Sequence, residues 1–329
     1  MNVLFVHNHR ARFVQIDLSL LRERYRVEEW YQRGRTVSLP KLTRSLSQND
    51  WVVGWFASWH TLFPVLLARI LKRPSILIIG GYDTANLPEI GYGSQRGGIK
   101  RWMARTTMNF ASRLITNSFY ARDEAVRNAG VDPEKIAVIH HGFDLADSPH
   151  RISKENMAIT VANVDRDNLH RKGLAPFVRA AALLPDIPFV LIGAWRDDAI
   201  EHLRSFAPAN VQFTGRLDDA ALSTFLARAR VYVQASRHEA FGMALAEAML
   251  SECVPVVTRA GALPEVVGET GIYIDSAEPQ IVAEGIRRAI TCDDGWGNRA
   301  RTRIINEFPL ERRRKGLYSV IEKTLEQHG

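Results

Sequence analysis

Two glutamates that could hold hydroxyl groups flank a turn that could hold phosphate. Glu239 precedes Phe241-Gly242, and Glu247 lies eight positions after Glu239 in a run of strong helix formers. Residues 231–236, just before them, read as a short buried strand. A helix N-terminus offers free backbone N–H groups and a partial positive charge, which suit phosphate, and carboxylates accept hydrogen bonds from hydroxyls. Phosphate held by the backbone between two such carboxylates is the pattern expected for a bound nucleotide sugar.

Apolar runs alternate with amphipathic stretches along the whole chain, which is typical of parallel sheets with crossover helices. Buried strands are expected over residues 3–6, 51–56, 75–79, 114–116, 135–139, 157–164, 189–193, 211–213, 231–236, 255–258 and 271–274. Helices are expected over residues 61–71, 100–111, 119–129, 174–184, 197–205, 218–229, 279–289 and 310–327. The polar segment 145–156 reads as a hinge. Two doubly wound halves joined by a hinge should enclose a cleft, the usual place for a ligand.

Length and composition limit the classes of protein to which this chain can belong. The chain has 329 residues, 46% of them hydrophobic, which is enough for two ordinary domains. No apolar run reaches the roughly 18–20 residues that span a bilayer. Residues 1–6 are too short for the core of a signal peptide. Cys253 and Cys292 lie far apart without metal-ligand spacing, so we expect reduced thiols in a cytoplasmic protein.

The net charge of +7 favours an anionic partner: nucleic acid, an anionic membrane surface or an acidic substrate. A nucleic-acid binder would need basic residues massed on one face, whereas here the positive charge is spread along the chain, so no nucleic acid is expected. The segment Arg96–Arg105 places basic residues beside Ile99, Trp102 and Met103. Such a segment can lie on an anionic membrane surface. The alternative is an ordinary solvated helix face with Trp102 in the core.

The stretch from Arg237 to Met249 resembles the Glu-x7-Glu signature of the retaining GT-B glycosyltransferases in the large GT4-like group, the glycosyl transferases group 1. Residues 256–268 resemble the glycine-rich loop and Pro-Glu-Val-Val that follow this signature in the family. Residues 138–144 resemble the family's motif before the hinge. There His140-His141 replaces the usual Pro-Asn, so Gly142 and Asp144 are transferred with more trust than the histidines.

The resemblance implies an α/β fold of the GT-B type: two Rossmann-like doubly wound domains with an interdomain cleft and a C-terminal crossover helix. It places an acceptor domain at residues 1–148 and a nucleotide-sugar donor domain at 149–309. Residues 310–329 would form a helix that packs back on the first domain. The implied activity is retaining, metal-independent transfer of a hexose-type sugar from a nucleoside diphosphate to a glycan, lipid or other hydroxyl acceptor, in cell-envelope or polysaccharide biosynthesis. A sugar-nucleotide epimerase of the same fold is the alternative.

The same resemblance implies a donor site in the second domain. Glu247 would hold the ribose hydroxyls, and Glu239 would contact hydroxyls of the donor sugar. Lys172, before Gly173, would stabilise the departing diphosphate, whose extra negative charge needs cations. Family members usually carry an arginine directly after the preceding strand. Here Asn163 or a neighbour stands at that place, so Arg166 is the candidate substitute. The remaining donor contacts would come from the start of the helix, at Phe241, Gly242, Met243 and Ala244.

The first domain departs from the family pattern where the acceptor would bind. After strand 75–79, many members carry a histidine near the donor sugar, whereas this chain has Gly80-Gly81-Tyr82-Asp83. Asp83 is the ionisable group at that strand end and is a catalytic candidate; the alternative is a turn cap. Asp165 and Asp167 imitate a metal-binding Asp-x-Asp, but nothing nearby adds ligands, so neither a metal nor a cofactor is expected.

Overall fold

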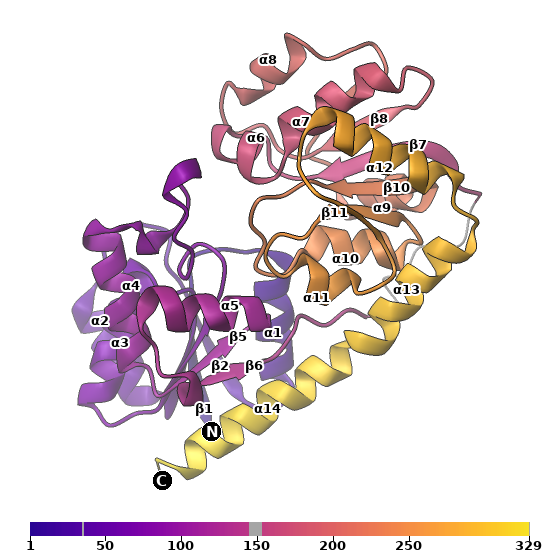
Figure 1. Ribbon diagram of the computed structural model, residues 1–329. Coiled ribbons are helices and arrows are strands. Elements are labelled where there is room, and N and C mark those ends of the chain that lie inside the picture. The colour runs from indigo at the N-terminus through magenta and orange to yellow at the C-terminus, as the bar shows by residue number, and fades with distance from the viewer. Residues whose placement is uncertain (35, 145–152, 329) are drawn as a thin grey trace. The chain divides into compact units, whose positions relative to one another are not determined.

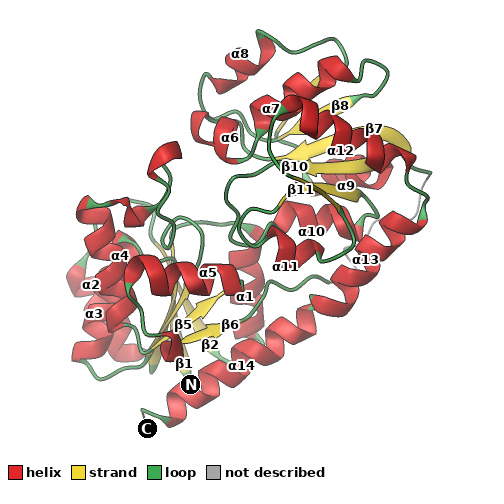
Figure 2. Cartoon of the chain, viewed as in Figure 1, coloured by secondary structure: helices red, strands yellow, loops and turns green. Residues whose placement is uncertain are grey.

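The chain forms two compact α/β units. The computed structural model describes residues 1–34, 36–144 and 153–328. The first unit comprises Met1–His141 and Glu311–Gly329, and the second comprises Gly142–Leu310. Within each unit, helices flank a parallel sheet of six strands in the described residues (Figures 1 and 2). The hinge expected at 145–156 falls for the most part outside the described residues.

The first unit is built on a sheet in the order β2-β1-β3-β4-β5-β6. Its strands are β1 (Asn2–His7), β2 (Arg26–Tyr31), β3 (Trp51–Trp55), β4 (Ser75–Ile79), β5 (Arg113–Thr116) and β6 (Ile136–Val138). β1, β3 and β4 are apolar and buried because helices cover both faces of a doubly wound sheet. The chain passes from β1 to β2 on one side of β1 and then returns to β3 on the other side. In doubly wound sheets, ligands bind at the carboxyl ends of the strands where the strand order reverses in this way.

Helices of the first unit lie on both faces of this sheet. They are α1 (Arg12–Arg22), α2 (Leu39–Gln48), α3 (Trp59–Ile70), α4 (Gly98–Phe110), α5 (Phe119–Glu124) with a π-helical turn (Ala125–Ala129), and the short turns Pro88–Ile90, Ser94–Arg96 and Pro133–Lys135. Figure 1 shows α2, α3 and α4 grouped on one face. Right-handed crossovers dictate this, because the chain moves in one direction from β2 onward.

The helix α14 (Leu310–Glu326) is anchored in the first unit by a buried ion pair. The Nε and Nη2 atoms of Arg313 each donate to an oxygen of Asp17 at 2.6 Å. The Nη1 atom of Arg313 donates to the carbonyl oxygens of Ile139 at 2.9 Å and His140 at 3.0 Å. This bidentate geometry satisfies two charges that would otherwise be costly to bury, so Arg313 fixes the helix against the end of β6.

The second unit repeats the doubly wound plan in another strand order, β12-β11-β10-β7-β8-β9. Its strands are β7 (Glu155–Val161), β8 (Phe189–Ile192), β9 (Val211–Gly215), β10 (Ala229–Gln234), β11 (Val254–Thr258) and β12 (Ile272–Ile274). Its helices are α6 (Arg166–Arg171), α7 (Leu174–Ala180) with the turn Ala181–Leu183, α8 (Ala199–Arg204), α9 (Asp219–Arg228), α10 (Met243–Leu250), α11 (Leu263–Val267), α12 (Pro279–Thr291) and α13 (Gly295–Glu307). This is the Rossmann order, in which the chain reverses direction between β7 and β10.

Two apolar cores cover the two faces of the second sheet. Along β8, Phe189 and Leu191 belong to one core, and Val190 and Ile192 belong to the other. The alternation follows from the two-residue period of a strand, which sends successive side chains to opposite faces. In the described residues, every helix is too short or too polar to cross a membrane.

Candidate functional site

The loops after β7 and β10 meet at the point where the second sheet reverses direction. The backbone N–H of Arg237, after β10, donates to the carbonyl oxygen of Arg171, after β7, at 2.8 Å. Gly173 has a φ of +68°, and a Cβ there would lie 2.2 Å from the carbonyl oxygen of Ala235. Only glycine allows so close an approach, so Gly173 brings the preceding Lys172 beside the end of β10.

A third loop, after β11, packs against the backbone of Glu239. Gly261 has a φ of +61°, and a Cβ there would lie 2.2 Å from the carbonyl oxygen of Glu239. The same carbonyl oxygen accepts a hydrogen bond from the backbone N–H of Ala262 at 2.9 Å. The glycine-rich loop recognised in the sequence therefore fixes the backbone that carries Glu239.

Lys172 and Glu239 form an ion pair at the centre of these loops. The Glu239 side chain is nearly buried, and its Oε1 also accepts from the Ser236 hydroxyl at 3.3 Å. Burial by itself would raise the pKa of Glu239, but Lys172 and then Arg171 outweigh it and lower the pKa. Burial lowers the pKa of Lys172, and Glu239 opposes that shift. The site thus holds an ammonium and a carboxylate that a ligand with complementary groups could separate.

The helix α10 begins beside this pair. Gly242 is its N-cap residue, with a left-handed backbone at φ +102°. The half-buried Met243 and Ala244 follow in its first turn, where backbone N–H groups have no partner within the helix. Phe241 is 2% exposed, with its ring 5.4 Å from that of Phe308, so its side chain supports the loop from the core.

Glu247 lies half-buried on α10, one helical turn after the N-terminus. Burial raises the pKa of Tyr232, and Glu239 and Glu247 both add to that rise. Both carboxylates therefore act on the same phenol of β10, and the structure brings the two glutamates of the signature to one region of the second unit.

Arg166 lies apart from the Lys172–Glu239 pair. Its side chain is 72% exposed and pairs with Asp198, with Nε donating to Oδ1 at 2.7 Å. Arg171, by contrast, contributes to the pKa shifts of both Glu239 and Lys172. Sequence reasoning missed Arg171 because spacing favoured Arg166; direct adjacency to Lys172 was the available signal.

Asp165 serves as the N-cap of α6, where its Oδ1 accepts from the backbone N–H of Asn168 at 2.8 Å. This bond explains an acidic residue at the start of the helix without a metal. In the part of the chain that the structure describes, no three His, Cys, Asp or Glu side chains gather as a metal site would require.

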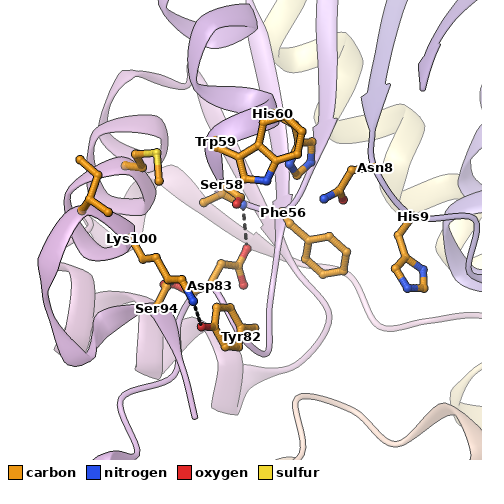
Figure 3. Close-up of a pocket in the computed structure, with 13 residues that line it drawn as sticks. Asn8, His9, Phe56, Ser58, Trp59, His60, Tyr82, Asp83, Ser94 and Lys100 are labelled. Carbon is orange, nitrogen blue, oxygen red and sulfur yellow. Dashed lines mark hydrogen bonds between the residues drawn. The ribbon is translucent and has the colours of Figure 1, made fainter. Parts of the chain in front are cut away.

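The first unit has a pocket of about 700 Å³ at the carboxyl ends of β1, β3 and β4 (Figure 3). Asn8 and His9 follow β1, Phe56 to His60 follow β3, and Tyr82 and Asp83 follow β4. The pocket thus includes the point where the first sheet reverses direction, between β1 and β3.

Asp83 lines this pocket and also holds its walls together. Its Oδ2 accepts from the backbone N–H of Ala57 and its Oδ1 from that of Gly80, both at 2.9 Å. Asp83 therefore caps the turn that begins at Gly80, and its catalytic role stays a prediction. Burial, only partly offset by these two bonds, raises the pKa of Asp83 to about 7. A carboxyl with such a pKa can accept a proton near neutral pH.

The second histidine of the motif before the hinge, His141, is buried within the first unit. His141 is 4% exposed, accepts from the Nδ2 of Asn117 at 3.1 Å and stacks on Trp55. Burial lowers the pKa of His141 well below its usual value, so the ring is neutral. Gly142 begins the second unit, and Asp144 is the last described residue before the gap at 145–152.

In the basic segment of the first unit, Trp102 is 55% exposed. The alternative that put this side chain in the core is therefore wrong. The indole points away from the interior because Ala104, Thr107 and Met108 form the buried face of α4.

Curated relatives match the chain over part of their own length. The D-inositol 3-phosphate glycosyltransferase of Mycolicibacterium gilvum is 28% identical over 272 residues, covering 75% of this chain and 58% of the relative. The O-antigen chain mannosyltransferase B of Escherichia coli is 30% identical over 211 residues, covering 58% of this chain and 54% of the relative. The chain thus spans little more than half the length of these relatives.

Solved structures share the fold. Anabaena HepE in complex with UDP and glucose superposes with a TM-score of 0.79 and 18% identity, covering 98% of this chain and 100% of that chain. The sucrose-phosphate synthase of Thermosynechococcus elongatus has a TM-score of 0.76 and 16% identity, covering 99% of both chains.

Two family profiles cover nearly the whole chain between them. Glycosyltransferase Family 4 matches residues 5–147, and Glycosyl transferases group 1 matches residues 146–307. The two matches meet close to the boundary between the structural units. The two sheets with their flanking helices are those of GT-B glycosyltransferase structures, as expected from the sequence. The chain therefore belongs to the GT4-like family of glycosyltransferases with the GT-B fold.

Proposed function

We propose that the protein is a retaining, metal-independent glycosyltransferase that moves a hexose-type sugar from a nucleoside diphosphate to a hydroxyl acceptor. One observation carries this proposal: Lys172 and Glu239 are paired beside the N-terminus of α10, where the Rossmann-order sheet reverses direction. A cation and free backbone N–H groups at this point suit a diphosphate, and a carboxylate beside them suits sugar hydroxyls.

In this proposal each donor group has a partner in the second unit. The diphosphate takes the ammonium of Lys172 and the first N–H groups of α10, at Met243 and Ala244. Arg171 adds positive charge close to the same position. Glu239, released from Lys172 when the diphosphate binds, accepts hydrogen bonds from the sugar. Glu247 accepts them from the ribose.

The proposed reaction exchanges one bond at the anomeric carbon for another on the same face of the sugar. The bond from the anomeric carbon to the diphosphate oxygen breaks, and the electron pair leaves with the diphosphate. A bond to the acceptor oxygen forms, and the departing phosphate takes the acceptor's proton. Lys172 and the α10 amides stabilise the growing charge on the leaving group, which lowers the barrier.

Two experiments, first on donor binding and then on the transfer reaction, test this proposal. A thermal-shift screen of nucleoside-diphosphate sugars should find one that stabilises the protein, by about 2.7 kcal/mol at 100 times its dissociation constant. Proton NMR of the reaction with an acceptor should then show a product with the donor's anomeric configuration. The donor incubated alone should keep its sugar unchanged; a changed sugar would identify an epimerase instead.

We further propose peripheral association with an anionic membrane through the first unit. On α4, Ile99 is 65% and Trp102 55% exposed, with Lys100 and Arg101 between them. A basic helix with exposed apolar side chains suits a membrane surface, where anionic head groups cover an apolar interior.

Vesicle binding tests the membrane proposal. Each basic residue near an anionic surface contributes about 1 kcal/mol. Reversing the charge with Arg101→Glu should therefore weaken binding to phosphatidylglycerol vesicles by more than about fivefold at low salt. The same reversal at exposed Arg44 on α2 should have a smaller effect. Equal losses would show that net charge rather than α4 governs the binding.

A further inference from the structure

The pocket of the first unit has apolar walls and a basic rim. The apolar lining comes from the segment after β3, with Phe56 and Trp59, and from α4, with Ile99 and Met103. Aromatic and aliphatic walls gain most when they bury apolar groups, so this lining favours a ligand with an apolar part over a purely polar one. An occupant that matches this pocket has an apolar part.

Lys100 supplies positive charge at the rim. Its ammonium donates to the Tyr82 hydroxyl at 3.0 Å and lies over the same ring (Figure 3). In the described part of the chain, no carboxylate forms an ion pair with Lys100. An ammonium has three donors, so two remain after the bond to Tyr82.

His60 and Asp83, two buried titratable groups that line the pocket, offset only part of this charge. Burial lowers the pKa of His60 to about 4, so the imidazole is neutral and adds no second cation. Burial raises the pKa of Asp83 to about 7, so its carboxyl carries only part of a negative charge at neutral pH. The pocket therefore favours an anion over a neutral or cationic group.

The apolar wall continues onto the surface. Ile99 lines the pocket and is also among the most exposed large apolar side chains of the described residues, with Trp102 one turn further along α4. An apolar chain that leaves the pocket over Ile99 would meet Trp102 next. This continuity favours a ligand whose apolar part extends beyond the pocket.

We propose that this pocket takes the head of an amphipathic acceptor that bears a phosphate, with its lipid chain leaving over Ile99 toward a membrane surface. The phosphate pairs with Lys100, and the apolar segment next to it lies against Trp59 and Met103. The inference rests on the proposed function, because it assigns the acceptor of that transfer. It commits to a membrane lipid as the source, rather than a water-soluble phosphate ester.

Decyl phosphate below its micelle concentration is the probe, and calorimetry without any donor is the measurement. Wild-type protein should bind decyl phosphate at least tenfold more tightly than decyl glucoside, which is neutral, and than glycerol phosphate, which has no apolar chain. Lys100→Met keeps the stem and removes the charge, so it should weaken decyl phosphate binding by about tenfold, the scale of a hydrogen bond to a charged group. Lys41→Met on α2, an exposed lysine away from the pocket, is the matched control and should change nothing.

Each other outcome overturns a defined part of the inference. Equal loss in Lys100→Met and Lys41→Met would show nonspecific charge attraction rather than a site. Glycerol phosphate binding as tightly as decyl phosphate would replace the lipid with a soluble phosphate ester. No binding of decyl phosphate would remove the assignment altogether. Because the donor site lies in the other unit and is titrated separately, none of these results depends on whether the proposed donor binds.

Discussion

Replacing Asp83 with asparagine should change how the stability of the protein depends on pH. Burial raises the pKa of the folded carboxyl from its ordinary value of 3.8 to about 7. The folded state therefore keeps a proton that the unfolded state loses as pH rises. The free energy of unfolding should fall between about pH 4 and pH 7 and level off above, by about 1.4 kcal/mol for each pH unit in that window.

The magnitude follows from the width of that window. Between pH 5 and the folded pKa, wild-type protein should lose about 3 kcal/mol that Asp83→Asn, which cannot ionise, does not lose. Asparagine has one acceptor oxygen where the carboxyl offers two to Ala57 and Gly80. At pH 5 the variant should therefore be less stable by about 1–3 kcal/mol, the cost of an unsatisfied buried N–H. At pH 8 this deficit should vanish or reverse.

Urea unfolding at pH 5, 6, 7 and 8 measures this difference. Tryptophan fluorescence suits it, because five of the seven tryptophans lie in the first unit. The control is Asp132→Asn, which also removes a carboxylate that accepts a backbone N–H, but at an exposed turn. Its cost should be at most about 1 kcal/mol, the scale of one lost hydrogen bond at the surface. A constant gap between wild type and Asp83→Asn would refute the account of a buried, protonated carboxyl. If Asp83 also acts on the acceptor, turnover should fall in Asp83→Asn while donor affinity stays.

Three further predictions concern the ion pairs and the leaving group. Lys172→Met removes the cation that lowers the pKa of Glu239, so the variant's free energy of unfolding in urea should fall more steeply from pH 5 to pH 8 than that of wild type; parallel profiles would contradict this. Arg313→Met leaves Asp17 buried and unpaired, so it should cost about 3–5 kcal/mol in the same assay. Arg24→Ala, which breaks an exposed ion pair with Glu322 of α14, should cost under about 1 kcal/mol. Sugar-transfer activity should survive dialysis against EDTA. A loss of this activity that Mn²⁺ restores would show instead that a metal ion binds the diphosphate.

The sequence predicted the strands that are apolar and buried on both faces. The Val-Leu-Phe-Val run of β1 and the Ser-Ile-Leu-Ile-Ile run of β4 could be read directly, because a doubly covered strand has no polar side. Strand β2 (Arg-Val-Glu-Glu-Trp-Tyr) was missed. It lies at the sheet edge and pairs only with β1, so charged side chains are allowed there. The helix α13 was missed because glycines stand at two of its first three positions.

Some features of the candidate site could also be predicted from the sequence, and others could not. Glu239, Glu247, Lys172 and Gly242 could be placed from local motifs, because these motifs mark strand ends and the first two turns of a helix. The pairing of Lys172 with Glu239 could not, since it depends on a close approach of two loops 67 residues apart. The role of Arg171 depends on the same approach, and the burial that shifts the pKa of Asp83 depends on packing around the whole loop.

Calorimetric titration of the nucleoside diphosphate that the thermal screen selects tests the donor site most directly. Wild-type protein should bind it without added metal. Glu247→Ala should weaken the binding by about 1.5–3 kcal/mol, since it removes a charged acceptor for two ribose hydroxyls. Glu269→Ala, which removes an exposed glutamate of the same unit, should bind as wild type does. Unchanged affinity in Glu247→Ala would contradict the assignment of the nucleotide to this helix.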